Sequence, residues 1–352
     1  GHWIEERSLP EKMKGSGVAV PEVYSLMGRI GGNVDGRESF FRSWIERLGR
    51  PECVICDTTS ISTHSEKLES AEFGYNRDEE DLPQVNLSLV LDRNGTPVWC
   101  RTTPGSIPNV STLRLNCQML DELGLKAFST SLDIGFYSRA NILEMLRGGM
   151  GFTIGVPFSV SKAKSLVRRH KTALNSAKRS FQYMGRIMRH VRDNWTIENG
   201  SERHDIDAHV FFEPEAHAER VARFERIIFQ IEDKAGKESF ASRRDAYLWL
   251  SENARRLATC FAVKNDEDGN VKIGRKARAV ACATAHFGYT IVLTDKKGRK
   301  GEEVLADYRS RDLAEKLFDS LKNENGQNRL RTGHDECAEG RLFLAFISLI
   351  LR

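Results

Sequence analysis

Residues 305–324 read LADYRSRDLAEKLFDSLKNE, and the interpretation of the whole chain depends on this stretch. It contains no Gly or Pro and is rich in Leu, Ala, Lys, Glu and Arg, a composition that favours an α-helix. Leu313, Leu317 and Leu321 recur every four residues, with Ala314 and Phe318 beside them. This spacing predicts one continuous amphipathic helix whose apolar face packs on the rest of the protein.

Polar side chains form a narrow stripe along this predicted helix. At about 100° per residue, four of them fall within an arc of roughly 60°: Tyr308, Arg311, Glu315 and Lys322. The stripe combines an aromatic hydroxyl, a guanidinium, a carboxylate and an ammonium group. One interpretation is a solvated helix face with an i,i+4 ion pair between Arg311 and Glu315. The other is a functional surface, which would need matching groups elsewhere in the chain.

Two aspartates stand close to the ends of predicted strands. Residues 51–61, PECVICDTTSI, predict a buried strand rich in Val, Ile and Cys, with Asp57 near its end. Residues 127–132 predict another strand, directly followed by Asp133. An acidic side chain in such a strand is costly to bury unless it is paired or binds a metal ion; the alternative is a solvated strand end. Asp57 and Asp133 would meet if the two strands are neighbours.

The segments around these strands complete an α/β pattern. Asn94-Gly95 between two alternating segments is typical of a β-hairpin. We expect its strands at 84–92 and 96–102, a further strand at 152–156, and helices at 110–123 and 140–147. The order strand, hairpin, helix, strand, helix, strand is the ribonuclease H-like order, and it predicts a mixed sheet with helices on its faces.

The sequence resembles DDE transposases of bacterial insertion sequences, in particular the long-insert branch of the insertion-sequence-four superfamily. The spacing Y-x2-R-x3-E-x6-K from Tyr308 to Lys322 matches the tyrosine–arginine–glutamate–lysine signature of these enzymes. Four further segments carry the resemblance: DTTS at 57–60, GYNRDEEDLPQVNL at 74–87, PGSIPNVSTL at 104–113 and LDIGFYS at 132–138. Two positions depart from the pattern, since Ile134 stands where relatives usually have Arg and Asn109 where they often have Asp.

The resemblance implies that Asp57, Asp133 and Glu315 are the catalytic carboxylates. Three carboxylates without a Cys/His cluster suit a hard cation, so we expect Mg²⁺ or Mn²⁺, two ions per site at a separation of about 3.5–4 Å. The polar residues on the same stripe as Glu315 are expected to hold DNA phosphates. The implied function is metal-dependent nicking at transposon ends, followed by strand transfer into target DNA by a homodimer that forms on DNA.

Two other classes of function stay open. The chain would act only as a DNA-binding protein if it is a decayed or domesticated transposase, an alternative that Ile134 favours. A ribonuclease H-like nuclease would cleave DNA with the help of metal ions but would not join the ends. Cleavage separates the binding protein from the enzymes, and joining separates the transposase from the nuclease.

A long segment interrupts the predicted core. Residues 161–192 hold ten Lys or Arg and no acidic residue, and they predict a long amphipathic helix with a basic back. A second predicted helix at 215–234 would pack against it as a helical hairpin. Arg168, Arg169 and Lys171 would then contact the DNA backbone. The alternative is a charged hairpin whose two halves neutralise each other.

Along the chain, we predict four regions: an N-terminal helical region (1–50), the first part of the core (51–160), the insertion (161–284) and the second part of the core (285–352).

The net charge of the 352-residue chain is only +4, so a basic surface must be local. The seven Cys form no metal-binding pattern, and there is neither a signal peptide nor an apolar run long enough to cross a membrane. We therefore expect a bacterial, cytoplasmic, nucleoid-associated protein without a membrane partner. The chain starts with Gly-His rather than Met, so we expect a tag remnant and missing sequence at one or both ends.

Overall fold

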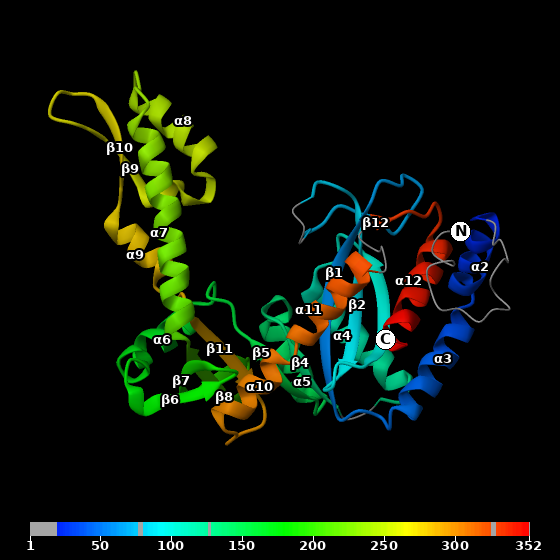
Figure 1. Cartoon of the computed structure of the whole chain (residues 1–352). Coiled ribbons are helices and arrows are strands. Elements are labelled where there is room, and N and C mark those ends of the chain that lie inside the picture. Colours follow the sequence, from blue (N-terminus) through cyan, green and yellow to red (C-terminus); the bar gives the residue numbers. More distant parts are fainter. Residues whose placement is uncertain (1–19, 77–79, 126–127, 325–328, 352) are drawn as a thin grey trace. The chain divides into compact units, whose positions relative to one another are not determined.

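The computed structural model describes residues 20–76, 80–125, 128–324 and 329–351 (Figure 1). The chain divides into two compact units. The first unit comprises Gly1–Gly155, Trp195–Asp207 and Leu293–Arg352, and the second comprises Val156–Asn194 and Ala208–Val292. All three candidate carboxylates belong to the first unit.

The first unit is a sheet with helices around it. Its helices are α2 (Val20–Gly32), α3 (Val34–Arg47), α4 (Asn109–Glu122), α5 (Arg139–Arg147), α10 (Gly301–Arg309), α11 (Asp312–Asp319) and α12 (Asp335–Ile350). Its strands are β1 (Cys53–Thr63), β2 (Gln84–Asp92), β3 (Pro97–Pro104), β4 (Ser129–Leu132), β5 (Gly151–Gly155) and β12 (Arg329–Leu330). Short helical turns are η2 (Ile134–Phe136) and a π-helical segment, η5 (Ser320–Glu324).

Within the first unit, neighbouring strands follow the order β3-β2-β1-β4-β5. The pairs β1–β2 and β2–β3 are antiparallel, whereas β1–β4 and β4–β5 are parallel. The predicted mixed sheet flanked by helices is therefore confirmed, and so are the hairpin and the helices of its first half. In the hairpin turn Gly95 adopts φ +87°, a conformation that favours glycine, and the carboxylate of Asp92 accepts hydrogen bonds from the backbone of Asn94 and Thr96.

β1 is the central strand and is buried along nearly its whole length. On one edge it pairs with β2 from Val54 to Ser62. On the other edge β4 ends at Leu132, opposite Cys56, and β12 joins at Ser62. The short strand β4 thus ends beside the middle of the long strand β1.

Two helices of the predicted N-terminal helical region, α2 and α3, pack on the rest of the first unit, and residues 1–19 of that region lie outside the described residues. α2 lies along α12 (Figure 1), and glycines on both helices let the backbones approach closely. A Cβ atom at Gly31 would stand 1.7 Å from the carbonyl oxygen of Glu336, and one at Gly340 would stand 1.9 Å from that of Met27. Any larger residue at these two positions would push the helices apart.

The second unit mixes helices and strands. Its helical elements are α6 (Ser161–Leu174), η3 (Ala177–Arg179), α7 (Pro214–Gly236), α8 (Arg243–Asn253), η4 (Arg255–Cys260) and α9 (Ala277–Thr284). Its strands are β6 (Ser180–Tyr183), β9 (Phe261–Asn265) and β10 (Val271–Arg275). Three strands have residues in both units: β7 (Arg186–Asn199), β8 (Glu202–Phe212) and β11 (Tyr289–Thr294).

The predicted long basic helix is wrong beyond Leu174. The helix stops there, and residues 180–199 form the strands β6 and β7. Met184 and Gly185, both at positive φ (48° and 79°), make the two-residue turn between them. The apolar spacing had suggested a helix through Gly185, but this turn fixes an antiparallel hairpin, so the predicted helical hairpin does not form.

The second predicted helix of this unit is present as α7, with different neighbours. The C-terminal half of α7 packs with α8, β9 and β10 around a small separate core, which includes Ile228, Leu250, Phe261 and Val263. Trp249 lies at the edge of this core with its ring centroid 6.0 Å from that of Phe240. It therefore serves packing.

Candidate active site

Asp57 and Asp133 occupy equivalent positions on neighbouring parallel strands. The last paired residues of β1 and β4 are Cys56 and Leu132, and the two aspartates follow them directly. Adjacent strands lie about 4.8 Å apart, so the two carboxyl groups start from neighbouring backbone positions. The fold thus brings together two acids that are far apart in the sequence.

The sequence had suggested that Asp57 lies near the end of its strand, but it lies in the middle of β1. It is opposite Leu89 of β2, and only 3% of its surface is exposed. Its Oδ1 accepts a hydrogen bond from the backbone N–H of Thr58 (2.8 Å). A buried carboxylate in a strand requires such partners, because its desolvation is costly.

The predicted continuous helix of residues 305–324 is broken at Ser310 and Arg311, between α10 and α11. The hydroxyl of Ser310 donates to the carbonyl oxygen of Asp307 (2.6 Å), a local bond that competes with regular helix. The next turn tightens, with i→i−3 hydrogen bonds from Leu313 to Ser310 and from Ala314 to Arg311. The predicted helix is therefore two shorter helices, with Tyr308 on α10 and Glu315 on α11.

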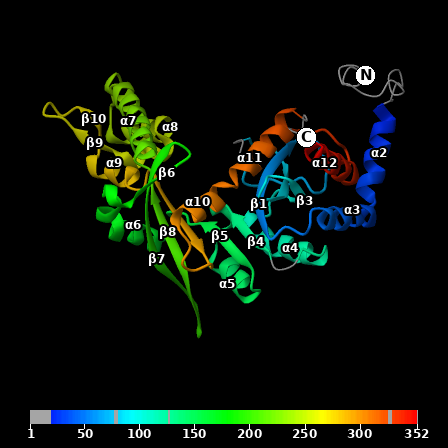
Figure 2. The same cartoon turned by 60° about the horizontal axis from the view of Figure 1, so that its bottom comes forward.

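Arg311 links two of the candidate carboxylates. Its Nη1 donates to Oδ1 of Asp133 and lies 3.8 Å from Oε1 of Glu315. Glu315 is in the first turn of α11, which packs beside β1 in both views of Figures 1 and 2, and its side chain is 54% exposed. Another nitrogen of the same guanidinium, Nε of Arg311, is buried and has no hydrogen-bond partner among the described residues.

Tyr308 supports Arg311 through its ring. Only 5% of its surface is exposed, and the guanidinium of Arg311 lies 4.8 Å from the centre of the ring. Burial raises the pKa of Tyr308 to about 12, so the phenol stays neutral near pH 7. The direct contact between this hydroxyl and a DNA phosphate stays a prediction, while the ring of Tyr308 lies against the guanidinium of Arg311.

Gly155, at the end of β5, is required by this arrangement, and no sequence pattern pointed to it. A Cβ atom there would lie 2.4 Å from the hydroxyl of Tyr308 and 2.6 Å from Cγ2 of Ile134. Ile134 itself is half exposed. The cation beside Asp133 thus comes from Arg311, not from residue 134.

Lys322 lies farther along the chain, in η5. Its charge acts on Glu80, whose pKa is lowered first by hydrogen bonds from Arg329 and Ser62 and additionally by Lys322. Ser62 is at the end of β1. Lys322 therefore lies near the C-terminal end of β1, the strand that carries Asp57.

The remaining candidates, Arg168, Arg169 and Lys171, lie in the second unit, on α6. All three are exposed, and Arg169 pairs with Asp193 at 3.0 Å. Leu166, Val167 and Leu174 form the buried side of the same helix. The basic side of α6 therefore faces solvent within its own unit.

A model of the transposase DDE domain family matches residues 48–351, which includes every residue of the site described above. The chain belongs to the DDE transposase family. No curated protein matches it. Membership makes the protein a transposase, an enzyme of nucleic-acid phosphoryl transfer that binds transposon DNA.

DDE transposases generally use divalent metal ions. Within the described ranges, no group of three or more His, Cys, Asp or Glu side chains is arranged to hold a metal ion, and Arg311 neutralises Asp133. The donor set nevertheless fits a hard cation, because Asp57, Asp133 and Glu315 offer only carboxylate oxygens. No described helix of this DDE transposase is both long and apolar enough to cross a membrane.

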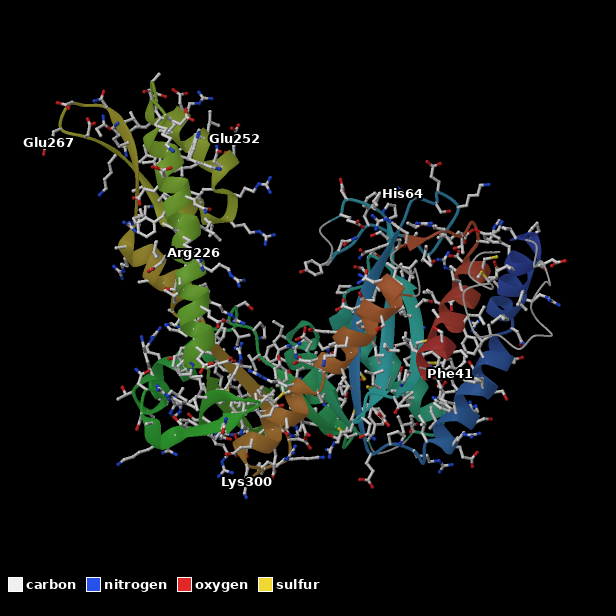
Figure 3. All side chains as sticks on the ribbon, viewed as in Figure 1. Phe41, His64, Arg226, Glu252, Glu267 and Lys300 are labelled. Carbon is white, nitrogen blue, oxygen red and sulfur yellow. The ribbon has the colours of Figure 1, made fainter. Side chains whose placement is uncertain are left out.

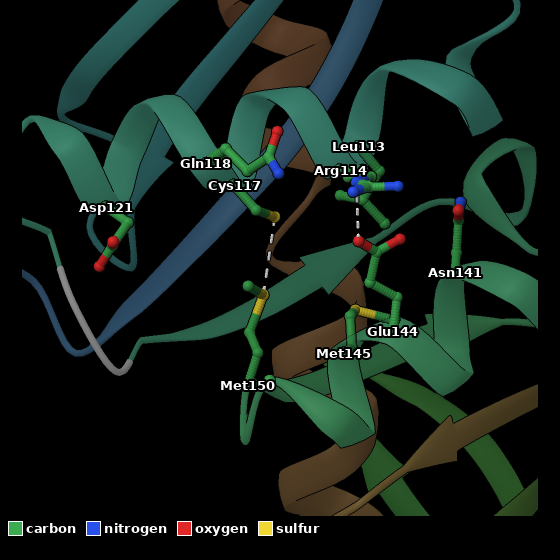
Figure 4. A pocket seen from close by; sticks show the side chains of 10 residues that line it. Leu113, Arg114, Cys117, Gln118, Asp121, Asn141, Glu144, Met145 and Met150 are labelled. Carbon is green, nitrogen blue, oxygen red and sulfur yellow. Dashed lines mark hydrogen bonds and ion pairs between the residues drawn. The ribbon is translucent and has the colours of Figure 1, made fainter.

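A cavity of about 210 Å³ lies between α4 and α5 of the transposase (Figure 4). Cys117 and Met150 meet there with their sulfur atoms 3.6 Å apart, and an ion pair between Arg114 and Glu144 lies at its wall. Burial raises the pKa of the Cys117 thiol, which keeps it protonated. This thiol is therefore a poor nucleophile, and the carboxylate site remains the candidate for the chemistry.

Proposed function

We propose that the chain is a cut-and-paste DNA transposase of the insertion-sequence-four superfamily, long-insert branch, with Asp57, Asp133 and Glu315 as its catalytic carboxylates. The observation that carries the proposal is the equivalent position of Asp57 and Asp133 on neighbouring strands. Arg311, which touches Asp133 and lies close to Glu315, supports the inclusion of the third carboxylate.

The three carboxylates would hold Mg²⁺ or Mn²⁺, two ions in the complete site. When bound, such ions activate an attacking oxygen and stabilise a leaving oxygen at phosphorus. Asp57 is fixed by its strand, whereas Glu315 is on a half-exposed helical turn and can adjust its rotamer. Asp133 would serve as a ligand if Arg311 turned away from it.

Arg311 has a second role in this proposal. Its guanidinium rests on the ring of Tyr308 and its Nε lacks a partner among the described residues, so it can donate to a DNA phosphate when it leaves Asp133. Lys322 would hold a phosphate farther along the same strand of DNA. Because these contacts are to phosphates, they position the DNA without reading its sequence.

The exposed cations of α6 would bind the backbone of the same DNA or of target DNA. Arg168, Arg169 and Lys171 are exposed on one helix, which suits phosphate contacts. The complex with transposon-end DNA would contain two copies of the chain, because two ends are processed together.

The test uses linear duplexes made from the DNA that flanks the reading frame, where the proposal expects inverted repeats. We expect the purified chain to nick them with Mg²⁺ or Mn²⁺ but not with EDTA, and to join the cleaved end to a supercoiled plasmid. Asp57→Asn and Asp133→Asn should bind the duplexes and fail to nick them. Metal-independent binding without nicking by the parent would favour a decayed transposase, and nicking without joining would favour a nuclease.

A further inference from the structure

The loop between β1 and β2 exposes two aromatic rings. The side chains of Phe73 and Tyr75 are among the most exposed large apolar groups of the first unit, at 64% and 87%. Figure 3 labels His64, where β1 enters this loop. Neither ring belongs to the proposed catalytic site, although Tyr75 lies in the segment 74–87 that the family resemblance includes.

The backbone that carries these rings is firmly held. Glu72 and Gln84 form an isolated antiparallel bridge, with backbone hydrogen bonds of 3.0 Å in both directions. The buried amide of Gln84 donates to the carbonyl oxygen of Tyr75 (2.9 Å). A Cβ atom at Gly74 would lie 1.9 Å from the carbonyl oxygen of Gly105, so the chain touches a neighbouring loop directly between the two rings.

The neighbouring loop is fixed as well. Asn86, buried in β2, donates from its side-chain amide to the carbonyl oxygens of Pro104, Gly105 and Ile107, at 3.3, 3.2 and 3.0 Å. A Cβ atom at Gly105 would in turn lie 2.2 Å from the carbonyl oxygen of Gln84. The backbone under the two exposed rings is therefore held in place before any ligand arrives, which lowers the entropic cost of binding.

The loop is attached to the strand that carries Asp57. Asn76, next to Tyr75, donates to the hydroxyl of Ser62 on β1 (2.9 Å). Ser62 lies five residues after Asp57, a distance of roughly 17 Å along an extended strand. That length corresponds to about five stacked nucleotides. Lys322 and Arg329 lie at the same end of β1, where both interact with Glu80.

We propose that Phe73 and Tyr75 form a stacking platform for unpaired DNA bases a few nucleotides from the cleavage position. This inference rests on the proposed function, which brings the DNA to Asp57. Aromatic rings stack on any base, so the platform would favour unpaired nucleotides over a particular sequence. The nearby cations would hold the phosphates between the stacked base and the catalytic carboxylates.

The experiment compares a single-stranded oligonucleotide that contains 2-aminopurine with a blunt duplex of the same sequence, in EDTA. We expect the parent to quench the fluorescence of the single strand. The double variant Phe73→Ala/Tyr75→Ala should lose this quenching and bind the single strand roughly 5- to 100-fold more weakly, with duplex affinity changed less than about twofold. Tyr247→Ala, which removes an exposed ring of α8 in the second unit, is the matched control and should behave like the parent.

A rescue variant removes the remaining ambiguity. Phe73→Trp/Tyr75→Trp keeps two stacking rings and should restore both quenching and single-strand affinity. The platform is refuted if the alanine variant quenches like the parent, or if the tryptophan variant binds no better than the alanine variant. Since these measurements need no metal ion, they are independent of nicking: a parent that quenches but never nicks or joins would refute the proposed function alone.

Discussion

The guanidinium of Arg311 lies on the carboxylate of Asp133, which is 178 residues earlier in the chain. The same group is close to Glu315 and rests on the ring of Tyr308. Burial works against the charge of Arg311, but the surrounding groups, Tyr308 first among them, outweigh it and raise the pKa of the guanidinium. A permanent cation therefore occupies the position beside a proposed metal ligand.

Removal of this cation should strengthen metal binding and weaken catalysis. In Arg311→Met, Asp133 no longer has a competitor for the metal ion, so Mn²⁺ should bind roughly 3- to 10-fold more tightly in a calorimetric titration. Nicking should fall at the same time, because the variant lacks a group that holds a DNA phosphate. Lys316→Met removes an exposed charge of the same sign from α11 and should leave both quantities unchanged. Unchanged Mn²⁺ affinity in Arg311→Met would show that Arg311 does not compete for the metal site.

Glu315 and Lys322 should separate chemistry from DNA binding. Glu315→Gln keeps the shape of a half-exposed side chain but removes the charge that holds a hard cation, so nicking should fall by orders of magnitude while end-DNA binding persists. Lys322→Ala should instead weaken binding and reduce the salt slope by about 0.9, the effect of one phosphate. Filter binding over a salt series, beside a nicking assay with Mg²⁺, measures both. Nicking at the parent rate by Glu315→Gln would exclude it as a metal ligand.

High pH should destabilise the protein through Tyr308. Its folded pKa of about 12 exceeds the usual value of 10, so between these values the folded protein keeps the phenol proton that the unfolded chain has released. The contribution is complete below pH 10 and disappears as the pH rises to 12, at most ~2.7 kcal/mol of unfolding free energy. Urea unfolding at pH 9 to 12 should show a smaller decrease in stability for Tyr308→Phe. Tyr75→Phe, an exposed control, should follow the parent.

The basic side of α6 should bind DNA without sequence preference. Reversal of Arg168, Arg169 and Lys171 to Glu should weaken binding to unrelated duplexes equally and lower the salt slope by about 0.9 for each phosphate that the variant no longer neutralises. Reversal of Lys234 and Lys237, exposed at the end of α7, serves as the control for net charge. If both variants weaken binding in proportion to their charge, α6 is not a specific contact surface.

The core of the fold was predictable because its signals are local. A strand of Val, Ile and Cys, a hairpin at Asn94-Gly95 and short amphipathic helices each follow from neighbouring residues. The side-chain bond of Ser310 that breaks the helix of residues 305–324, and the tight turn at Gly185, are single-residue effects that outweighed a helical spacing of apolar side chains.

The detailed geometry of the site depends on contacts that no spacing reveals. The contact between Arg311 and Asp133 requires that β1 and β4 be neighbours and that α11 pack beside β1, both of which are properties of the folded chain. The sequence suggested that the polar stripe acts as a unit, but it could not show that Tyr308 is buried while Glu315 is exposed.

Gly155 should matter because of Tyr308, and a double-mutant cycle can show this. Gly155→Ala places a methyl group where the hydroxyl of Tyr308 and a methyl of Ile134 already stand, so unfolding free energy should fall by about 1–3 kcal/mol. Tyr308→Phe removes the closest of the clashing atoms and should recover about 1 kcal/mol of this decrease, a coupling that two independent sites would not show. Gly274→Ala, in the open strand β10 with no atom within 4 Å of the new methyl, should be nearly neutral.

The same cycle has a functional readout. Because the ring of Tyr308 carries the guanidinium of Arg311, a displaced ring moves the group that we expect to hold DNA phosphate. Nicking by Gly155→Ala should therefore fall even at a temperature where the variant is fully folded, and Tyr308→Phe should partly restore it. If Gly155→Ala is less stable but nicks like the parent once folded, the contact with Tyr308 serves packing alone, and Arg311 is positioned by Asp133.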